Sequence, residues 1–259
     1  MKIIYYYQTF VGLDQLLTHP KDIDVIIVSS IHFGKNIHNN PDIFLNDNNP
    51  HDPKFNQLWN ETKEISEQGV TITCMVGGAG LAYQELFSNF DVYYQLLVNF
   101  IRSKPWIKGI DLDIEEDVRL EDVQMLIHKI KNDFGKDFII TMAPLGTSLS
   151  YDGGSMGGFD YKTLYLSKEG SQIDWFNCQC YDSFTVNLLK RIIKNGYPEN
   201  KIIMGMESGQ FTDQTFIENI KQMKIKYPNF RGVYDWEYLN APPNSKDPSE
   251  WAKLIRKIN

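Results

Sequence analysis

The feature that most constrains this chain is a strand-like apolar run that recurs eight times, each followed by a helical pattern. The runs are Ile3–Gln8, Asp24–Phe33, Val70–Val76, Trp106–Ile114, Phe138–Ala143, Ile173–Tyr181, Lys201–Met206 and Phe230–Trp236. Near-continuous apolar strands are typical of a parallel sheet that helices cover on its outer face. Eight such units in 259 residues match a (β/α)8 barrel, the TIM barrel. A doubly wound open sheet is the alternative, and the regular repetition favours closure.

The helical patterns between these runs complete the alternation. We expect helices over Leu13–His19, Phe55–Gln68, Leu81–Arg102 (broken near Asn89–Asp91), Arg119–Phe134, Tyr161–Ser167, Val186–Asn195, Asp213–Ile225 and Pro248–Ile258. Asp247 is suited to the N-cap of the last helix, with Pro248 at its first position. No linker or shift in composition divides the sequence, so residues 1–259 are predicted to form a single domain.

One segment, Lys35–Lys54, departs from the pattern because it is rich in Asn, Asp and Pro. It follows the second strand, at the end of the barrel where active sites lie. A loop that borders the cleft and a floppy surface insertion are equally compatible with this composition.

Charge and cysteine content restrict the class of protein. The net charge of −7 argues against a nucleic-acid or anionic-membrane partner, and no apolar run approaches the roughly 20 residues that cross a bilayer. The first residues resemble a strand rather than a signal peptide, so we expect a cytoplasmic protein. Cys74, Cys178 and Cys180 are too few for a disulfide framework and are predicted to be reduced core residues.

Three acids alternate along the fourth predicted strand, in the sequence KGIDLDIE at 108–115. Asp111, Asp113 and Glu115 occupy positions i, i+2 and i+4, so a strand places them on one face, roughly 6–7 Å apart at the Cα. The apolar residues between them face the opposite way, toward the helices. The acids are therefore predicted to point into the barrel and to rise toward its mouth.

Burying three acids without partners is costly, so folding alone does not explain them. Mutual repulsion and desolvation are expected to raise at least one pKa, which would keep a carboxylic acid protonated for general acid catalysis. A metal cage and a purely structural network are the alternatives. A row along one strand is a poor chelate, and no His accompanies it.

The acid row resembles the D-G-x-D-x-D-x-E signature of glycoside hydrolase family 18, which includes chitinases and endo-β-N-acetylglucosaminidases. Four more stretches resemble that family in the same order along the chain. They are MVGG at Met75–Gly78, TMAP at Thr141–Pro144, QCYD at Gln179–Asp182, and GVYDWE, which contains Trp236. The resemblance spans the whole predicted barrel.

This resemblance implies catalytic roles for four residues. Glu115 would protonate the glycosidic oxygen, and Asp113 would orient the N-acetyl group of the substrate. Asp111 would tune Asp113 from behind, and Tyr181 would hydrogen-bond the acetamide carbonyl. The family uses the substrate's own acetamide as nucleophile, so a second catalytic carboxylate of the usual kind is not required.

Further residues are expected to contact the sugar. Trp236 would form an apolar floor under the ring, with ordinary core packing as the alternative. Strand parity puts Asn177, Gln179 and Tyr181 on one face. The remaining expected contacts are Gly77, Gly78 and Met142 within the motifs, and Gln8, His32 and Glu207 at strand ends. For those last three, ordinary hydrogen-bonded loop residues are the alternative.

The sequence departs from the family pattern at three positions. Lys108 replaces the first Asp of the signature, on the outward face, Met75 replaces a Ser near the acids, and Gln179 replaces a Met. The stretch Glu207–Asn229 is long enough for one helix only, so the insertion domain of some family chitinases is predicted to be absent. That absence predicts a shallow, open groove.

Together these features predict a retaining hydrolase that cleaves β-1,4 bonds at N-acetylglucosamine in chitin, chito-oligosaccharides or the chitobiose core of N-glycans. We expect a monomer that needs no metal or cofactor and whose partner is an N-acetylglucosamine-containing glycan. A sugar-binding protein without turnover is the alternative, and retention of Glu115 favours the enzyme. A barrel enzyme for phosphorylated metabolites fits poorly, because no Gly-rich phosphate loop follows the seventh or eighth strand.

Overall fold

A ring of eight parallel strands forms the centre of the molecule. The computed structural model describes residues 1–209 and 215–258. The strands are β1 (Lys2–Tyr7), β2 (Val25–Lys35), β4 (Thr71–Gly77), β5 (Ile107–Asp113), β6 (Ile139–Met142), β7 (Trp175–Gln179), β8 (Ile202–Glu207) and β9 (Gly232–Trp236). Each pairs with the next, and β1 pairs with both β2 and β9, which closes the ring. The predicted TIM barrel is confirmed.

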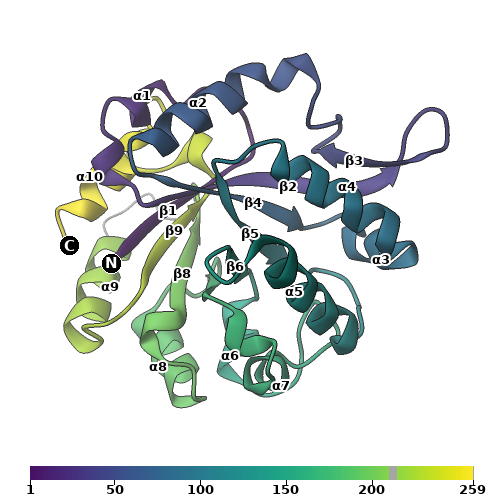
Figure 1. Cartoon of the computed structure of the whole chain (residues 1–259). Coiled ribbons are helices and arrows are strands. Elements are labelled where there is room, and N and C mark those ends of the chain that lie inside the picture. The colour runs from purple at the N-terminus through teal and green to yellow at the C-terminus, as the bar shows by residue number, and fades with distance from the viewer. Residues whose placement is uncertain (210–214, 259) are drawn as a thin grey trace.

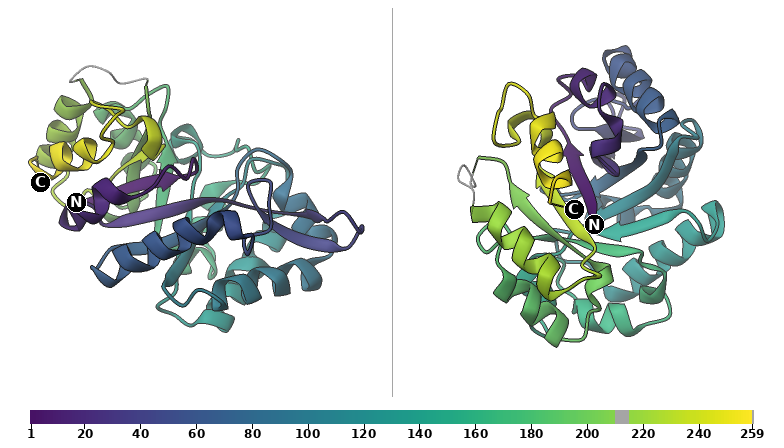
Figure 2. Two further views of the ribbon diagram at one scale, coloured as in Figure 1. Left: turned by 90° about the horizontal axis from the view of Figure 1, so that it is seen from above. Right: turned by 90° about the vertical axis from the view of Figure 1, so that its left-hand side faces the viewer.

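Helices surround the ring on its outside (Figures 1 and 2). They are α1 (Asp14–Leu17), α2 (Asn56–Glu67), α3 (Ala82–Ser88), α4 (Phe90–Arg102), α5 (Leu120–Phe134), α6 (Gly146–Ser150), α7 (Tyr161–Leu166), α8 (Val186–Lys194), α9 (Thr215–Lys226) and α10 (Ser249–Arg256). The expected break near Asn89 separates α3 from α4. The short helix α6 lies in a stretch for which no helix was predicted, and the expected start at Asp213 lies outside the described residues.

The segment after β2 is an ordered hairpin rather than a floppy insertion. Strand β3 (Pro41–Leu45) runs antiparallel to the extended end of β2, and the hairpin projects from one side of the ring (Figure 1). Strand pairing satisfies the backbone groups that a loop would leave to water. After β3, Asn46 and Asp47 line a hollow beside the barrel mouth, so this part of the segment does border the cleft region.

Side-chain alternation divides the core into two layers. Inside the ring, the buried side chains are Ile4, Tyr6, Val25, Ile27, Met75, Trp175, Ile203 and Tyr234. A larger apolar layer lies between the ring and the helices, and all three cysteines belong to it. They are free and fully buried, and burial raises the pKa of Cys74 and Cys180 to about 12.

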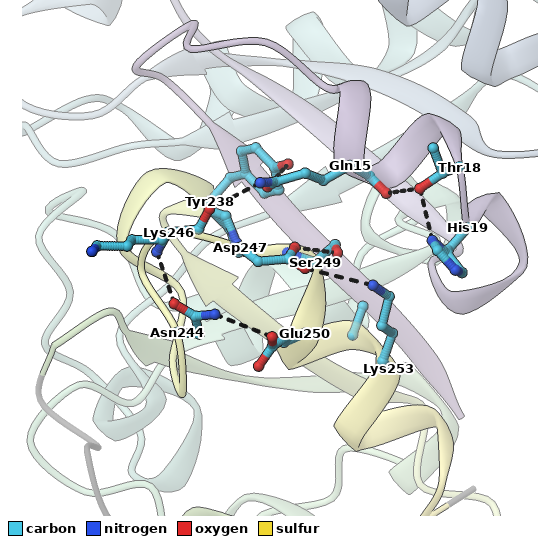
Figure 3. Close-up of polar contacts among 12 residues, drawn as sticks. Gln15, Thr18, His19, Tyr238, Asn244, Lys246, Asp247, Ser249, Glu250 and Lys253 are labelled. Carbon is cyan, nitrogen blue, oxygen red and sulfur yellow. Dashed lines mark hydrogen bonds and ion pairs between the residues drawn. The ribbon is translucent and has the colours of Figure 1, made fainter.

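Polar contacts attach the segment before α10 to α1 (Figure 3). The Gln15 side-chain amide donates to the Lys246 carbonyl at 2.9 Å. Asp247 accepts from the Ser249 backbone N–H at 3.2 Å and pairs with Lys253 at 3.7 Å. The expected cap is displaced by one residue: Pro248 is the N-cap and α10 begins at Ser249, so Asp247 lies one position before the cap. The two chain ends lie side by side (Figures 1 and 2).

Between β8 and β9 the described residues form a single helix, α9, and the chain makes one domain around one barrel. In the part of the chain that the structure describes, no helix is long and apolar enough to cross a membrane.

Candidate active site

The acid row lies on β5 and the loop after it, on the inner side of the barrel. Asp111 is fully buried, Asp113 is 5% exposed, and Glu115 is half-buried. The apolar residues between them belong to the outer core layer, as strand alternation predicts. Lys108 is exposed on the outer side, where its ammonium donates to the Pro105 carbonyl at 2.6 Å.

Asp111 is surrounded by hydrogen-bond donors. Its Oδ2 accepts from the Tyr6 hydroxyl at 2.7 Å, and its Oδ1 accepts from Thr141 at 2.5 Å and from the Asn177 amide at 3.0 Å. Trp175 holds that amide by donating to its oxygen at 2.9 Å. Burial raises the pKa of Asp111, while these three hydrogen bonds act in the opposite direction.

Asp113 and Glu115 share one donor. The Gln179 amide nitrogen donates at 3.1 Å to Asp113 Oδ1 and at 3.1 Å to Glu115 Oε1. It also lies 3.0 Å from the Ala143 carbonyl. Desolvation raises the pKa of Asp113 well above its usual value, and the nearby charges of Glu115 and Asp111 add to that effect. A proton on Asp113 is therefore retained at higher pH than on an ordinary aspartate.

A pocket of about 270 Å³ opens directly above these acids. The lining residues are Gln8, Ser30, His32, Met75, Gly77, Gly78, Ala79, Asp113, Glu115, Gln179, Tyr181 and Trp236. The Tyr181 hydroxyl accepts from Tyr234 at 3.2 Å, and the Trp236 ring lies 5.4 Å from that of Tyr6. The pocket thus combines carboxylates, a phenol and an indole, which is the mixture that sugar recognition requires.

The turn after β4 forms one wall of the pocket. Gly77 has φ +100°, and a Cβ there would lie 2.1 Å from the Asp113 carbonyl oxygen, so only glycine fits this close approach. The next backbone N–H, of Gly78, donates to that same carbonyl at 2.9 Å. The glycine motif therefore serves to press the turn against the end of β5.

Beside this turn, on the neighbouring strand β2, His32 and Ser30 form a polar pair. The His32 Nε2 lies 2.7 Å from the Ser30 hydroxyl, and burial lowers the pKa of His32. Gln8, His32 and Ala79 also line a second, more open hollow, with Thr9, Asn46, Asp47 and Gly80. The pocket over the acids is therefore continuous with a polar depression beside the β2–β3 hairpin.

Nine of the expected residues line the pocket, and the others lie elsewhere. Met142 does not contact the cleft: it is fully buried in the outer layer, because Thr141 takes the inward position on β6. Asn177 is also fully buried and lies beneath the pocket, where it supports Asp111 instead of facing the sugar. Glu207 is half-buried at the end of β8 and is not among the residues that line the pocket.

The sequence did not single out Ser30 and Ala79, which line the pocket, nor two residues beneath it, Tyr6 and Thr141. The latter two both bond Asp111: Thr141 from the adjacent strand β6, and Tyr6 from β1 across the ring. Strand alternation could have identified Tyr6. Gln8 was expected at the barrel mouth, and a residue two positions earlier on the same strand shares its face. Among the described residues, no group of three or more His, Cys, Asp or Glu is arranged to hold a metal ion.

Comparisons with known proteins agree with this geometry. The model of the family Glycosyl hydrolases family 18 matches residues 2–214. A fungal endo-β-N-acetylglucosaminidase of that family is 30% identical, with a TM-score of 0.87 over 100% of this chain and 98% of the other. The chitinase ChiC from Aspergillus fumigatus is 29% identical, with a TM-score of 0.85 over 98% of each chain.

A family 18 chitinase from Pseudoalteromonas aurantia shares the fold at 20% identity, with a TM-score of 0.74 over 100% of both chains. A search of curated protein sequences returned no match. The family model covers most of the chain, including the acid row and the strands that support it. The chain therefore belongs to glycoside hydrolase family 18.

Proposed function

We propose that this protein is a retaining glycoside hydrolase that cleaves β-1,4 linkages at N-acetylglucosamine by substrate-assisted catalysis. The observation that carries the proposal is the Asp113–Glu115 pair, bridged by Gln179 and open to a pocket that also contains Tyr181 and Trp236. An aspartate behind the pair, Asp111, is fully bonded. The upper two acids are thereby left to act on the substrate.

In the proposed reaction, Glu115 donates a proton to the glycosidic oxygen as that bond breaks. The acetamide oxygen of the same sugar attacks the anomeric carbon and forms an oxazolinium-like intermediate, which water then opens with retention of configuration. Asp113 accepts from the acetamide N–H and stabilises the positive charge that develops. Glu115 then takes a proton from the attacking water, which returns it to its starting state.

Tyr181 and Trp236 position the sugar for this reaction. Burial raises the pKa of Tyr181 well above its usual value, so its hydroxyl stays protonated and can donate to the acetamide carbonyl. Trp236 offers an apolar face to the axial C–H groups of the pyranose. Both residues lie in the same pocket as the two acids.

The substrate lies in chitin, chito-oligosaccharides or the chitobiose core of N-glycans. The two most similar structures named above are titled as an endo-β-N-acetylglucosaminidase and a chitinase, and they support both kinds of substrate about equally. Mass spectrometry of the products from chitotetraose and from a high-mannose glycoprotein, incubated side by side, distinguishes them. A mass that matches cleavage between the two core N-acetylglucosamines identifies the second activity.

Substitution of the acid tests the assignment. Glu115→Gln keeps the shape of the side chain and removes the proton donor, so kcat on the better substrate is expected to fall by about 10²–10⁴-fold. Wild type and variant are compared at equal folded concentration, with circular dichroism as the control. Equal turnover by both proteins refutes the proposal. Calorimetric binding of the glycan by wild type, with no product after long incubation, instead establishes the sugar-binding alternative.

A further inference from the structure

Glu116, the residue after the proposed acid, is a buried carboxylate to which the reaction assigns no part. It is 7% exposed. Its Oε1 accepts from the Tyr83 backbone N–H at 2.6 Å, and its Oε2 accepts from the Gln84 N–H at 3.1 Å. These are N–H groups of the first turn of α3, which have no partner within the helix. Both oxygens of Glu116 are thus committed to a different segment of the chain.

Helix α3 depends on this carboxylate because its own N-cap cannot serve. The N-cap residue is Leu81, which makes no capping bond and has φ +60°. That left-handed conformation is unfavourable for leucine and persists only where the surroundings impose it. Glu116 therefore takes over the capping function that Ser, Thr, Asp or Asn provides in most helices, and it does so from the loop after β5.

A second contact attaches the same two segments on the other side of Glu115. The Gly78 N–H donates to the Asp113 carbonyl at 2.9 Å, and the buried ring of Tyr83 lies directly below Gly77. The Tyr83 hydroxyl donates to the Val76 carbonyl at 2.7 Å. The loop after β4 thus holds the chain at Asp113 and again at Glu116, with Glu115 between the two attachments.

We propose that Glu116 is a positioning residue that fixes where Glu115 meets the glycosidic oxygen. If the Glu116 attachment is lost, the nearest attachment on the C-terminal side of residue 115 is removed and the next is the Val118 N–H bonded to the Gly157 carbonyl. The acid then drifts relative to Asp113 and the pocket wall at Gly77–Ala79. A displacement near 1 Å at a reacting group costs up to about 10²-fold in rate. The inference rests on the proposed function, since Glu115 must be the acid for its position to matter.

The test compares Glu116 with a matched buried carboxylate remote from the pocket. Glu61 is 8% exposed and accepts from the Leu13 N–H at 3.1 Å and from Gln57 at 2.8 Å. We expect Glu116→Ala to lower kcat by about 10- to 100-fold with KM changed less than about 2-fold. Glu61→Ala is expected to lower the Tm by a similar amount while kcat per folded molecule stays that of wild type.

A conservative variant separates position from charge. In Glu116→Gln the amide oxygen still accepts from Tyr83, but the amide nitrogen cannot accept from Gln84. We expect this variant to recover most of the kcat lost in Glu116→Ala. If Glu116→Ala does not fold, Glu116→Gln takes its place, with a kcat reduced about 2- to 5-fold, in proportion to the one bond lost.

Amide hydrogen exchange provides a readout that is independent of activity. Loss of the Glu116 hydrogen bonds is expected to accelerate amide exchange at Tyr83 and Gln84 in Glu116→Ala. No such acceleration is expected in Glu61→Ala. Three results for the Glu116 variant would overturn the inference. They are faster exchange with a kcat equal to that of wild type, unchanged exchange, and a loss of activity that appears only in KM. If wild-type protein hydrolyses neither chitotetraose nor glycoprotein, the proposed function is refuted instead. The exchange experiment still reports whether Glu116 holds the start of α3.

Discussion

The two ends of the acid row differ in their surroundings although only four residues separate them along β5 and the loop after it. Asp111 at the lower end accepts three hydrogen bonds from Tyr6, Thr141 and Asn177. Asp113 and Glu115 at the upper end share a single amide from Gln179. The lower carboxylate has three donors from the fold, whereas the upper pair has one shared donor and a hydrogen bond between Asp113 and Glu115 themselves. The contrast teaches that the barrel places most of its hydrogen-bond donors beneath the pocket and gives fewer donors to the two carboxylates that line it.

The largest effect is expected at the upper end of the acid row, at Asp113. Asp113→Asn removes the charge that would stabilise the intermediate, so kcat is expected to fall by about 10²–10³-fold. The same change removes a desolvated carboxylate, so the free energy of unfolding at pH 7 is expected to rise by about 0.5–2 kcal/mol. Urea unfolding and steady-state kinetics on the same samples measure both. A loss of stability would contradict the contrast.

The gain in stability in Asp113→Asn should depend on pH. Because the folded-state pKa of Asp113 is raised, the native protein retains a proton that the unfolded chain releases just above its ordinary aspartate pKa. Wild-type stability therefore falls as pH rises from about 4 toward the folded pKa. The difference between variant and wild type is expected to be small near pH 4 and to widen at higher pH.

The lower end is expected to respond in the opposite direction. Asn177→Leu removes one donor to Asp111 and leaves the Trp175 N–H without its acceptor, so the free energy of unfolding should fall by about 1–3 kcal/mol. Thermal unfolding by calorimetry measures the change, with Asn195→Leu, at the C-terminus of α8, as a control outside the barrel interior. If stability at Asn177 is unchanged, the carboxylate is not held by these donors.

Trp236 tests the pocket rather than the acids. Trp236→Ala removes the apolar face that is proposed to lie beneath the sugar, and aromatic contacts of this kind are worth about 0.5–1.5 kcal/mol. We expect KM to rise by about 2- to 10-fold while kcat changes less. A fall in kcat with KM unchanged would show that Trp236 acts on the reacting atoms instead of holding the ring.

The smallest effect is expected at Lys108, on the outer side of the same strand. Lys108→Ala should change the free energy of unfolding by less than about 0.5 kcal/mol, because the side chain is exposed. Its kinetic constants should equal those of wild type. A marked loss of activity would mean that this departure from the family signature reaches the acids through the strand.

Periodicity was enough to predict the ring and the face of the acid row, because both follow from alternation along strands. The prediction for Met142 was wrong because it followed the family motif and ignored strand alternation. Thr141 takes the inward position on β6, so its neighbour Met142 faces the outer layer. Periodicity also left Lys35–Lys54 undecided, since a pairing between β2 and β3 depends on contacts that composition does not specify. Glu116 offered no local signal, because its partners Tyr83 and Gln84 lie on another β/α unit.

The three buried thiols have a practical consequence for experiments on this protein. With Cys74, Cys178 and Cys180 packed against the outer side of the ring and with little thiolate at neutral pH, maleimide reagents should leave the native chain unmodified. A cysteine introduced at Ile37, which is 95% exposed at the hairpin tip, would then carry a fluorophore at one defined place. Such a dye would report on the surroundings of the hairpin, without any need to remove the natural cysteines first.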